Sequence, residues 1–324
     1  MNNKNTLIGL NMVLVGLITF LGGYLVAQKK NTPSLANISS NLNRFSSATA
    51  KKQIGNDPKL LRLSSVKAVE PTLSDDGKKI LYSEKGTDKI FASDFSGLNN
   101  GFVKTKDKSS LNPNISGAAL SKNRQKIAYL YHDKGTDEGQ ISIANPDGSV
   151  FKNILPTRAR QLKFDWVNDN QISFYNPTGE DRDLFLLDLE SKQLEKILDS
   201  SNGLKILWSP DGSKLLYSAD NQLSFLNLKD KTVLAIDLST EADRCVWSLN
   251  SFLAYCGSTN SPQADSNSTV DSLYQLDIAK KEFGLFFQPS SIDKIKIKKP
   301  LLSPAEDYLF FVNDLDGYLY RISL

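Results

Sequence analysis

The chain has 324 residues, of which 40% are hydrophobic, and its formal net charge at pH 7 is only +3. A chain of this size and composition can bury a sizeable apolar core. The charge is unevenly spread, because residues 1–68 contain nine basic residues and one acid, whereas the remainder contains 30 basic and 35 acidic residues. The larger part therefore lacks the basic surface of a nucleic-acid-binding protein, and we expect no nucleic-acid partner.

Residues 7–27 form an uncharged, mostly aliphatic segment that follows a short N-terminal tail, residues 1–6. As a helix, these 21 residues would span the roughly 30 Å hydrocarbon layer of a bilayer. Backbone groups in lipid must be satisfied within the segment, so we expect a transmembrane helix that acts as a signal anchor. A cleaved signal peptide is the alternative, but the residues that end at Ala27 fit a small-x-small cleavage site poorly.

Residues 28–57 are polar and basic, with few large apolar side chains. This composition predicts a flexible stalk between the membrane and the globular part of the chain. Lys51 and Lys52 could lie on anionic lipid headgroups, and a merely solvated linker is the simpler interpretation.

A turn-and-strand pattern recurs through residues 58–324. In its clearest copy, residues 207–218, an apolar strand end leads into the turn Ser-Pro-Asp-Gly and then into a second apolar strand. Proline presets φ for such a turn, and aspartate and glycine tolerate the conformations that it needs. The anchor residues of the six copies lie 47, 46, 42, 39 and 55 residues apart, within the period range of a propeller blade. These anchors are Leu73, Leu120, Trp166, Trp208, Trp247 and Leu302.

Each copy is followed by an alternating strand and often by a weaker fourth run. We therefore expect an all-β, six-bladed β-propeller of four-stranded antiparallel blades over residues 58–324, preceded by one N-terminal transmembrane α-helix. The last copy lacks its fourth strand at the end of this sequence. Residues 59–63 look like that missing strand, and we expect them to pair with residues 318–322 and close the last blade.

The repeat also supplies candidate site residues. Those of the repeated turn are Ser74, Asp76, Gly77, Ser121, Ser209, Pro210, Asp211, Gly212, Ser303 and Pro304. Trp166, Trp208 and Trp247 occupy one repeat position and could form an aromatic platform for a ligand. A fixed position in each blade favours the other interpretation, in which they form a core between blades.

The pattern resembles the TolB-like propeller repeat, whose blades carry a Ser-Pro-Asp-Gly turn between two strands. Residues 208–217 match that motif fully, residues 73–82 match it with Asp75 in place of proline, and the other copies match in part. The resemblance covers roughly residues 58–324. It implies the fold and little about function, because this architecture hosts many unrelated activities.

The side of the membrane on which the propeller lies is predicted from two opposing arguments. The lysines that follow residues 7–27 mildly favour a cytoplasmic propeller. TolB-like propellers are typically exported, and a cysteine pair suits an oxidising compartment. We expect a single-pass membrane protein of a bacterial cell envelope, with its propeller outside the cytoplasm.

Cys245 and Cys256 are the only cysteines, and they flank the predicted hairpin turn of the fifth copy. With the turn centred between Asn250 and Ser251, the two cysteines stand opposite each other. Directly opposed residues of paired strands can approach within disulfide range, so a disulfide is possible. Two buried thiols that pack as small apolar side chains remain the alternative.

No catalytic, metal-binding or cofactor-binding residue is predicted. His132 is the only histidine, and no Gly-x-Ser-x-Gly stretch accompanies it. The acidic stretches 145–148 and 314–317 lack the spaced ligands of a calcium loop and are interpreted as turns.

We expect a non-catalytic, membrane-anchored propeller, not an enzyme, that offers one face to a protein partner or an envelope component. The alternative is a small-molecule sensor or an enzyme that uses the central channel, which would need polar side chains converging from several blades.

Overall fold

The computed structural model describes residues 44–47, 60–105, 114–133, 135–178, 182–199, 201–259, 270–290 and 292–324. The predicted transmembrane segment 7–27 and most of the predicted stalk lie outside these ranges. Within them, no helix is both long enough and apolar enough to cross a membrane.

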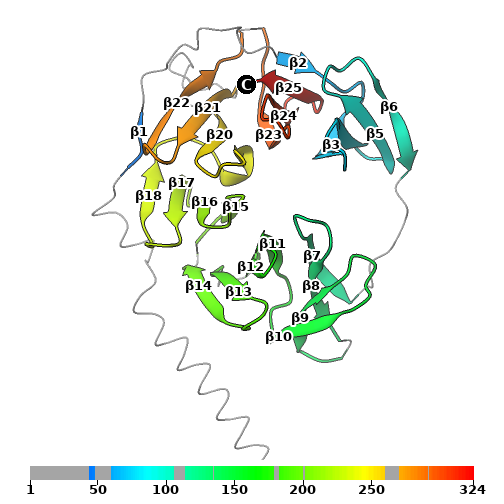
Figure 1. Cartoon of the computed structure of the whole chain (residues 1–324), viewed down its shortest axis with the longest axis vertical. Coiled ribbons are helices and arrows are strands. Elements are labelled where there is room, and N and C mark those ends of the chain that lie inside the picture. The colour runs from blue at the N-terminus through cyan, green and yellow to red at the C-terminus, as the bar shows by residue number, and fades with distance from the viewer. Residues whose placement is uncertain are drawn as a thin grey trace, which may run out of the picture.

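The described residues form six sheets around a common centre (Figure 1). The first sheet contains β3 (Ala68–Leu73), β4 (Lys79–Glu84), β5 (Lys89–Asp94) and β6 (Asn100–Thr105). The second contains β7 (Ile115–Leu120), β8 (Ile127–His132), β9 (Gly139–Ala144) and β10 (Lys152–Thr157). The third contains β11 (Lys163–Asn168), β12 (Gln171–Tyr175), β13 (Leu184–Asp188) and β14 (Leu194–Leu198).

The remaining sheets follow the same antiparallel order. The fourth contains β15 (Lys205–Trp208), β16 (Lys214–Ala219), β17 (Gln222–Asn227) and β18 (Val233–Ile236). The fifth contains β19 (Cys245–Trp247), β20 (Leu253–Ser258), β21 (Ser272–Asp277) and β22 (Glu282–Phe287), and the short 3-10 helix η2 (Ala242–Arg244) precedes it. The sixth contains β23 (Ile297–Leu302), β24 (Tyr308–Asn313), β25 (Leu319–Ser323) and β2 (Leu60–Arg62).

The first strand of a sheet lies near the centre and the fourth lies at the rim, as β3, β7 and β15 and then β6, β14 and β18 show in Figure 1. In each sheet, strands that follow one another in the chain pair as neighbours, as in a meander, and only β1 and β2 come from elsewhere in the chain. The predicted all-β fold of four-stranded antiparallel sheets is confirmed, although the fifth sheet is mixed because it also takes up a parallel strand.

The sixth sheet is completed by residues from the other end of the described chain. β2 pairs antiparallel with β25, with Leu60 opposite Ile322. The backbone N–H of Leu63 donates to the carbonyl oxygen of Leu319 at 2.7 Å, and the hydroxyl of Ser64 accepts from the Leu319 N–H at 2.8 Å. The strand that the sequence analysis expected at residues 59–63 therefore covers the outer edge of this sheet.

A short piece of the segment expected as a flexible stalk binds the rim. β1 (Ser46–Ser47) pairs parallel with β22, and the Phe45 N–H donates to the Ala235 carbonyl of β18 at 3.0 Å. Phe45 is only 3% exposed and packs edge-on against Phe225. Burial of this one large apolar side chain offsets part of the loss of backbone entropy in residues 44–47.

Five apolar clusters join neighbouring sheets. They lie between the second and third, third and fourth, fourth and fifth, fifth and sixth, and sixth and first sheets. In the described part of the chain, no such cluster joins the first sheet to the second. Leu120, the anchor residue of the second sheet, is accordingly 48% exposed.

Candidate functional site

The three tryptophans connect neighbouring sheets. Trp166, Trp208 and Trp247 are each at most 5% exposed. Each indole N–H donates to the preceding sheet, to the Ala119 carbonyl at 2.9 Å, the Ser173 hydroxyl at 2.8 Å and the Leu207 carbonyl at 3.0 Å, respectively. These side chains therefore lie in the cores between sheets and present no open aromatic surface.

The predicted turn residues close the hairpin between the first and second strands. Ser209 accepts from the Lys214 N–H at 3.0 Å, and its hydroxyl donates to Asp211 at 2.5 Å. Ser74, Ser121 and Ser303 accept the equivalent backbone hydrogen bond in the first, second and sixth sheets. The serine thus satisfies backbone groups at the strand ends, which is a structural role.

The six hairpin turns also form a circle of contacts around one face. Gly212 shows how tight this circle is, because a Cβ atom added there would lie 2.9 Å from Val167 Cγ1 of the third sheet. The contacts are Arg124 with Asp75, Asn123 with Asp169, Gly212 against Val167, the Asp211 N–H with Ser251, Ser248 with Glu306, and Gly77 against Pro304. Residues of the repeated turn, through side chains, backbone N–H groups and close glycine contacts, therefore hold the sheets to one another.

Lys122 extends from the turn of the second sheet to the third and fourth sheets. Its Nζ donates to the carbonyl oxygens of Val167 at 2.9 Å, Pro210 at 3.3 Å and Ser209 at 3.4 Å. Burial lowers the pKa of Lys122 and raises the pKa of Asp165 in β11 to about 6, and each of the two charges partly offsets the shift of the other.

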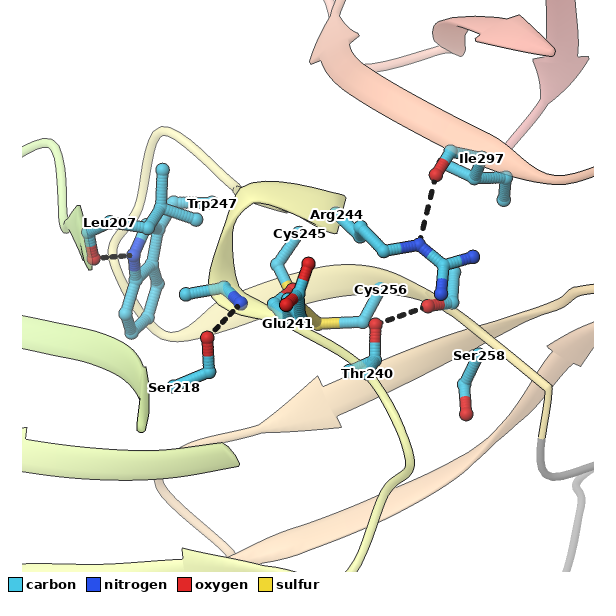
Figure 2. Close-up of a disulfide and its surroundings, with 12 residues drawn as sticks. Leu207, Ser218, Thr240, Glu241, Arg244, Cys245, Trp247, Cys256, Ser258 and Ile297 are labelled. Carbon is cyan, nitrogen blue, oxygen red and sulfur yellow. Dashed lines mark hydrogen bonds between the residues drawn. A yellow bond between two sulfur atoms is a disulfide. The ribbon is translucent and has the colours of Figure 1, made fainter. Parts of the chain in front are cut away.

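The two cysteines are bonded to each other. Cys245 and Cys256 stand opposite each other in β19 and β20, with Cα atoms 4.1 Å apart. Figure 2 shows the disulfide beside η2, with Arg244 directed towards Ile297 of the sixth sheet. Arg244 donates to the Ile297 carbonyl at 3.1 Å and forms an ion pair with the fully buried Asp271. The disulfide links β19 to β20, and the ion pair links η2 to the residue that precedes β21, so both stabilise the fifth sheet.

A cavity of about 470 Å³ lies between the first and sixth sheets. Its walls come from β3, from β23 and from the loop between β24 and β25. Four lysines line it, and they are Lys67, Lys85, Lys298 and Lys299. This is the size of a small-molecule site, and it combines side chains from two sheets.

The carboxylates of this cavity are less available than its ammonium groups. Asp314 accepts from Lys298 at 2.9 Å, and that ammonium holds the pKa of Asp314 below its usual value. Asp316 accepts from the hydroxyl of Tyr320 at 2.8 Å. By contrast, Lys67, Lys85 and Lys299 form no ion pair with the side chains that the structure describes.

Sequence reasoning did not select these lysines. A signal was present, because Glu70-Pro71 and Lys299-Pro300 each place a charged residue and a proline just before the anchors Leu73 and Leu302. An alignment of the repeats on their anchors would have shown two charged residues at one position. It would not have shown that a cavity lies beside them.

Other candidate residues do not gather into a site. His132 ends β8 next to Gly139, and residues 145–148 and 314–317 form turns between strands. Across the described ranges, no three histidine, cysteine, aspartate or glutamate side chains are placed to hold a metal ion together.

No protein-family model matches the sequence, and no curated protein matches it significantly. Solved structures are similar in fold. The β-propeller domain of Swd1 from Myceliophteria thermophila is 12% identical, with a TM-score of 0.51 over 82% of this chain and 99% of that one. An oligogalacturonate lyase solved with manganese is 12% identical, with a TM-score of 0.49 over 78% and 76% of the two chains. TolB from Acinetobacter baumannii is 15% identical, with a TM-score of 0.43 over 73% and 59%.

One expectation is corrected by these similarities. The prediction that the protein is not an enzyme is wrong, because enzymes such as oligogalacturonate lyase have the same propeller fold. Neither the fold nor the lack of a familiar catalytic motif excludes catalysis. What the similarity to the Swd1 propeller and the arrangement of the sheets show is the architecture: this chain is a β-propeller protein.

Proposed function

We propose that this propeller binds a small anionic molecule in the cavity between its first and sixth sheets. The observation that carries the proposal is the set of three lysines, Lys67, Lys85 and Lys299, that line one cavity without an ion-pair partner among the described residues. Of the two functions that the sequence predicts, this proposal favours the small-molecule site over a propeller that only offers a face to a partner.

The positive charge is concentrated at this cavity. Residues 69–324 contain more acids than bases, so three ammonium groups in one cavity that form no ion pair with a described side chain stand out from their surroundings. Opposite charges 4 Å apart attract by about 1 kcal/mol in bulk water and about 4 kcal/mol near a protein surface. Several such contacts in a partly enclosed site are enough for measurable affinity.

The proposal extends to the parts of the chain outside the described ranges. Residues 7–27 would anchor the protein in a membrane as a single-pass helix, since they are uncharged over a bilayer-spanning length. The six sheets would act as the six blades of a TolB-like ring outside the cytoplasm, with a protein partner on one face. The repeated turn and the cysteine pair support this arrangement.

The test is a titration of the full-length chain, purified in detergent, with succinate, inorganic phosphate and neutral glucose. We expect either anion, but not glucose, to raise the melting temperature, because a ligand at 100 times its Kd stabilises a protein by about 2.7 kcal/mol. Replacement of the three lysines (Lys67→Ala, Lys85→Ala and Lys299→Gly) should abolish the effect.

The control changes the same number of charges elsewhere. Lys104, Lys152 and Lys229 are exposed and belong to the first, second and fourth sheets. A chain with all three replaced by alanine should respond to the anions as the wild type does. An equal response from the chain without the cavity lysines would contradict the proposal.

A further inference from the structure

Large apolar side chains are exposed on two turns, one in the first sheet and one in the second. Leu98, in the turn between β5 and β6, is 86% exposed. Val150 and Phe151, between β9 and β10, are 80% and 67% exposed. A single exposed apolar residue is ordinary on a protein surface, but three on the turns of neighbouring sheets indicate a surface that binds something.

Val150 also has an unfavourable backbone conformation. Its φ is +52°, which is a genuine outlier for a β-branched residue and suits glycine or asparagine better. Hydrogen bonds fix the turn that precedes it. The Asn145 N–H donates to the Ser149 carbonyl at 2.9 Å, and the Ser149 hydroxyl donates to Asp147 at 2.7 Å. The chain thus keeps a strained apolar residue at an exposed position, which is a feature of binding sites.

Both turns lie on the face of the ring that carries the hairpin turns between first and second strands. The turn after the third strand of an antiparallel meander is at the same end of the sheet as the turn after the first. We call this side of the propeller the turn face. Of the ten large apolar residues that are exposed in the described ranges, five lie in turns of this face. They are Leu98, Val150, Phe151, Leu249 and Phe252.

The N-terminal part of the described chain enters the propeller from the turn face. β1 pairs parallel with the beginning of β22, where the Ser46 N–H donates to the Lys281 carbonyl at 2.9 Å. Arg44 likewise lies parallel to β18, beside Ala235. Each of these two fourth strands begins at the turn face and runs away from it. The chain therefore reaches Arg44 from the side of the turn face.

We infer that the turn face lies on a lipid bilayer, and that Leu98, Val150 and Phe151 insert into the interface of that bilayer. The inference rests on the membrane anchor of the proposed function, because residues 28–43 lead from the proposed helix 7–27 to an entry point on this face. Apolar side chains on separate turns can enter a fluid surface together, whereas a folded partner would need a pocket for each of them.

The contact is apolar, because the charges of these turns have both signs. Lys152 follows Phe151 and is exposed, so its ammonium can reach a lipid phosphate. Asp94 and Asp147 belong to the same two turns. The hydroxyl and N–H of Ser149 hold the pKa of Asp147 below its usual value, so this carboxylate stays ionised among the headgroups. We therefore expect binding to neutral phosphatidylcholine without any anionic lipid.

The cavity of the proposed function lies on the side away from the lipid. Its walls include Lys85, between β4 and β5, and residues 314–317, between β24 and β25. Turns between second and third strands are at the end of a meander opposite to the turn face. A dissolved anion can therefore reach the lysines while the propeller lies on the membrane.

A fluorescent label on the full-length chain tests the inference. Cys245 and Cys256 are bonded to each other, so Phe151→Cys supplies the one reactive thiol for an environment-sensitive fluorophore. Ile292→Cys is the matched control, because Ile292 is 88% exposed in the connection between β22 and β23, on the opposite face. In phosphatidylcholine vesicles the label at position 151 should emit at shorter wavelength and lose fluorescence when the lipid is brominated. The label at position 292 should do neither.

A second variant removes any contribution of the label itself to insertion at position 151. The label is placed by Leu98→Cys and combined with Val150→Asn and Phe151→Ser, where asparagine suits the positive φ. Loss of two inserted apolar side chains should shift the docking equilibrium that this label reports by about tenfold or more. Ile292→Ser removes an apolar side chain from the opposite face and should leave the label unchanged.

Vesicle flotation separates the inference from the anchor on which it rests. A chain that floats with the vesicles while the label at position 151 stays in water would overturn the inference and leave the anchor and the anion site intact. A shifted label that brominated lipid does not quench would mean that a second copy or another protein covers the turns, and would also overturn it. A chain that does not float would overturn the anchor and the inference together, whereas failure of the anion titration would leave this inference standing.

Discussion

The two halves of the ring differ in how the first strand of each sheet ends. In the third, fourth and fifth sheets the anchor is a tryptophan whose indole donates to the preceding sheet. In the sixth, first and second sheets the anchor is a leucine, and a left-handed bulge lies three residues before it. The proposed site is in the leucine half, and the best-connected cores are in the tryptophan half.

The copies of the repeat therefore differ in how their anchor residue packs against the neighbouring sheet. A tryptophan fills the space between sheets and fixes their spacing through its N–H. A leucine fills less of that space and forms no hydrogen bond, while the bulge displaces the strand before it. The leucine half has a cavity beside the bulges of β3 and β23, between its first and sixth sheets, and, in the described part, no apolar cluster between its first and second sheets.

The largest expected difference between the halves is in stability. Trp208→Ala should lower the free energy of unfolding by about 3–5 kcal/mol, because the side chain is 5% exposed and its removal leaves a cavity. Leu120→Ala should cost below about 1 kcal/mol, since Leu120 is 48% exposed. Urea denaturation of both variants measures the contrast, and equal losses would mean that the halves are packed alike.

A smaller effect concerns the charge next to the anchor of the third sheet. The pKa of Asp165 is raised to about 6 in the folded chain, above about 3.9 in an unfolded one. The native state therefore holds this proton more tightly. Its contribution to stability is full below about pH 3.9 and is lost as the pH rises through 6, by about 3 kcal/mol.

Asp165→Asn removes that titration and should flatten the dependence of stability on pH between 4 and 7. Urea midpoints at several pH values measure it, and Asp169→Asn, at an exposed carboxyl of the same hairpin, is the control. The equivalent residues in the leucine half, Thr72 and Leu301, do not titrate. An unchanged pH slope in Asp165→Asn would show that Lys122 neutralises the carboxylate in the native state.

The smallest expected effect has opposite signs in the two halves. Lys299→Gly should raise the free energy of unfolding by up to about 1 kcal/mol, because its φ is +48°. Lys205→Gly, also three residues before its anchor but in a regular strand, should lower it by about 0.5–1 kcal/mol. Thermal melts of both variants measure these changes in stability. A loss of stability in both variants would contradict the interpretation that the bulge at Lys299 is strained.

Local patterns were sufficient to predict the hairpins. The turn between Asn250 and Ser251 places Cys245 opposite Cys256, because antiparallel partners are symmetric about the turn, and the structure pairs these two residues. Other features gave no local signal. Phe45 is the one large apolar side chain among polar neighbours, and its burial depends on a groove formed by two sheets that follow much later in the chain.

The sequence by itself determined the repeat, its anchors and the all-β architecture, because strand alternation and turn residues act over a few neighbouring positions. Only the tertiary structure decided where the lysines meet. A cavity depends on how far one sheet stands from the next, and that distance is the outcome of side-chain packing between residues far apart in the chain. Lys67 and Lys299 thus lie on one site although they are separated by nearly the whole propeller.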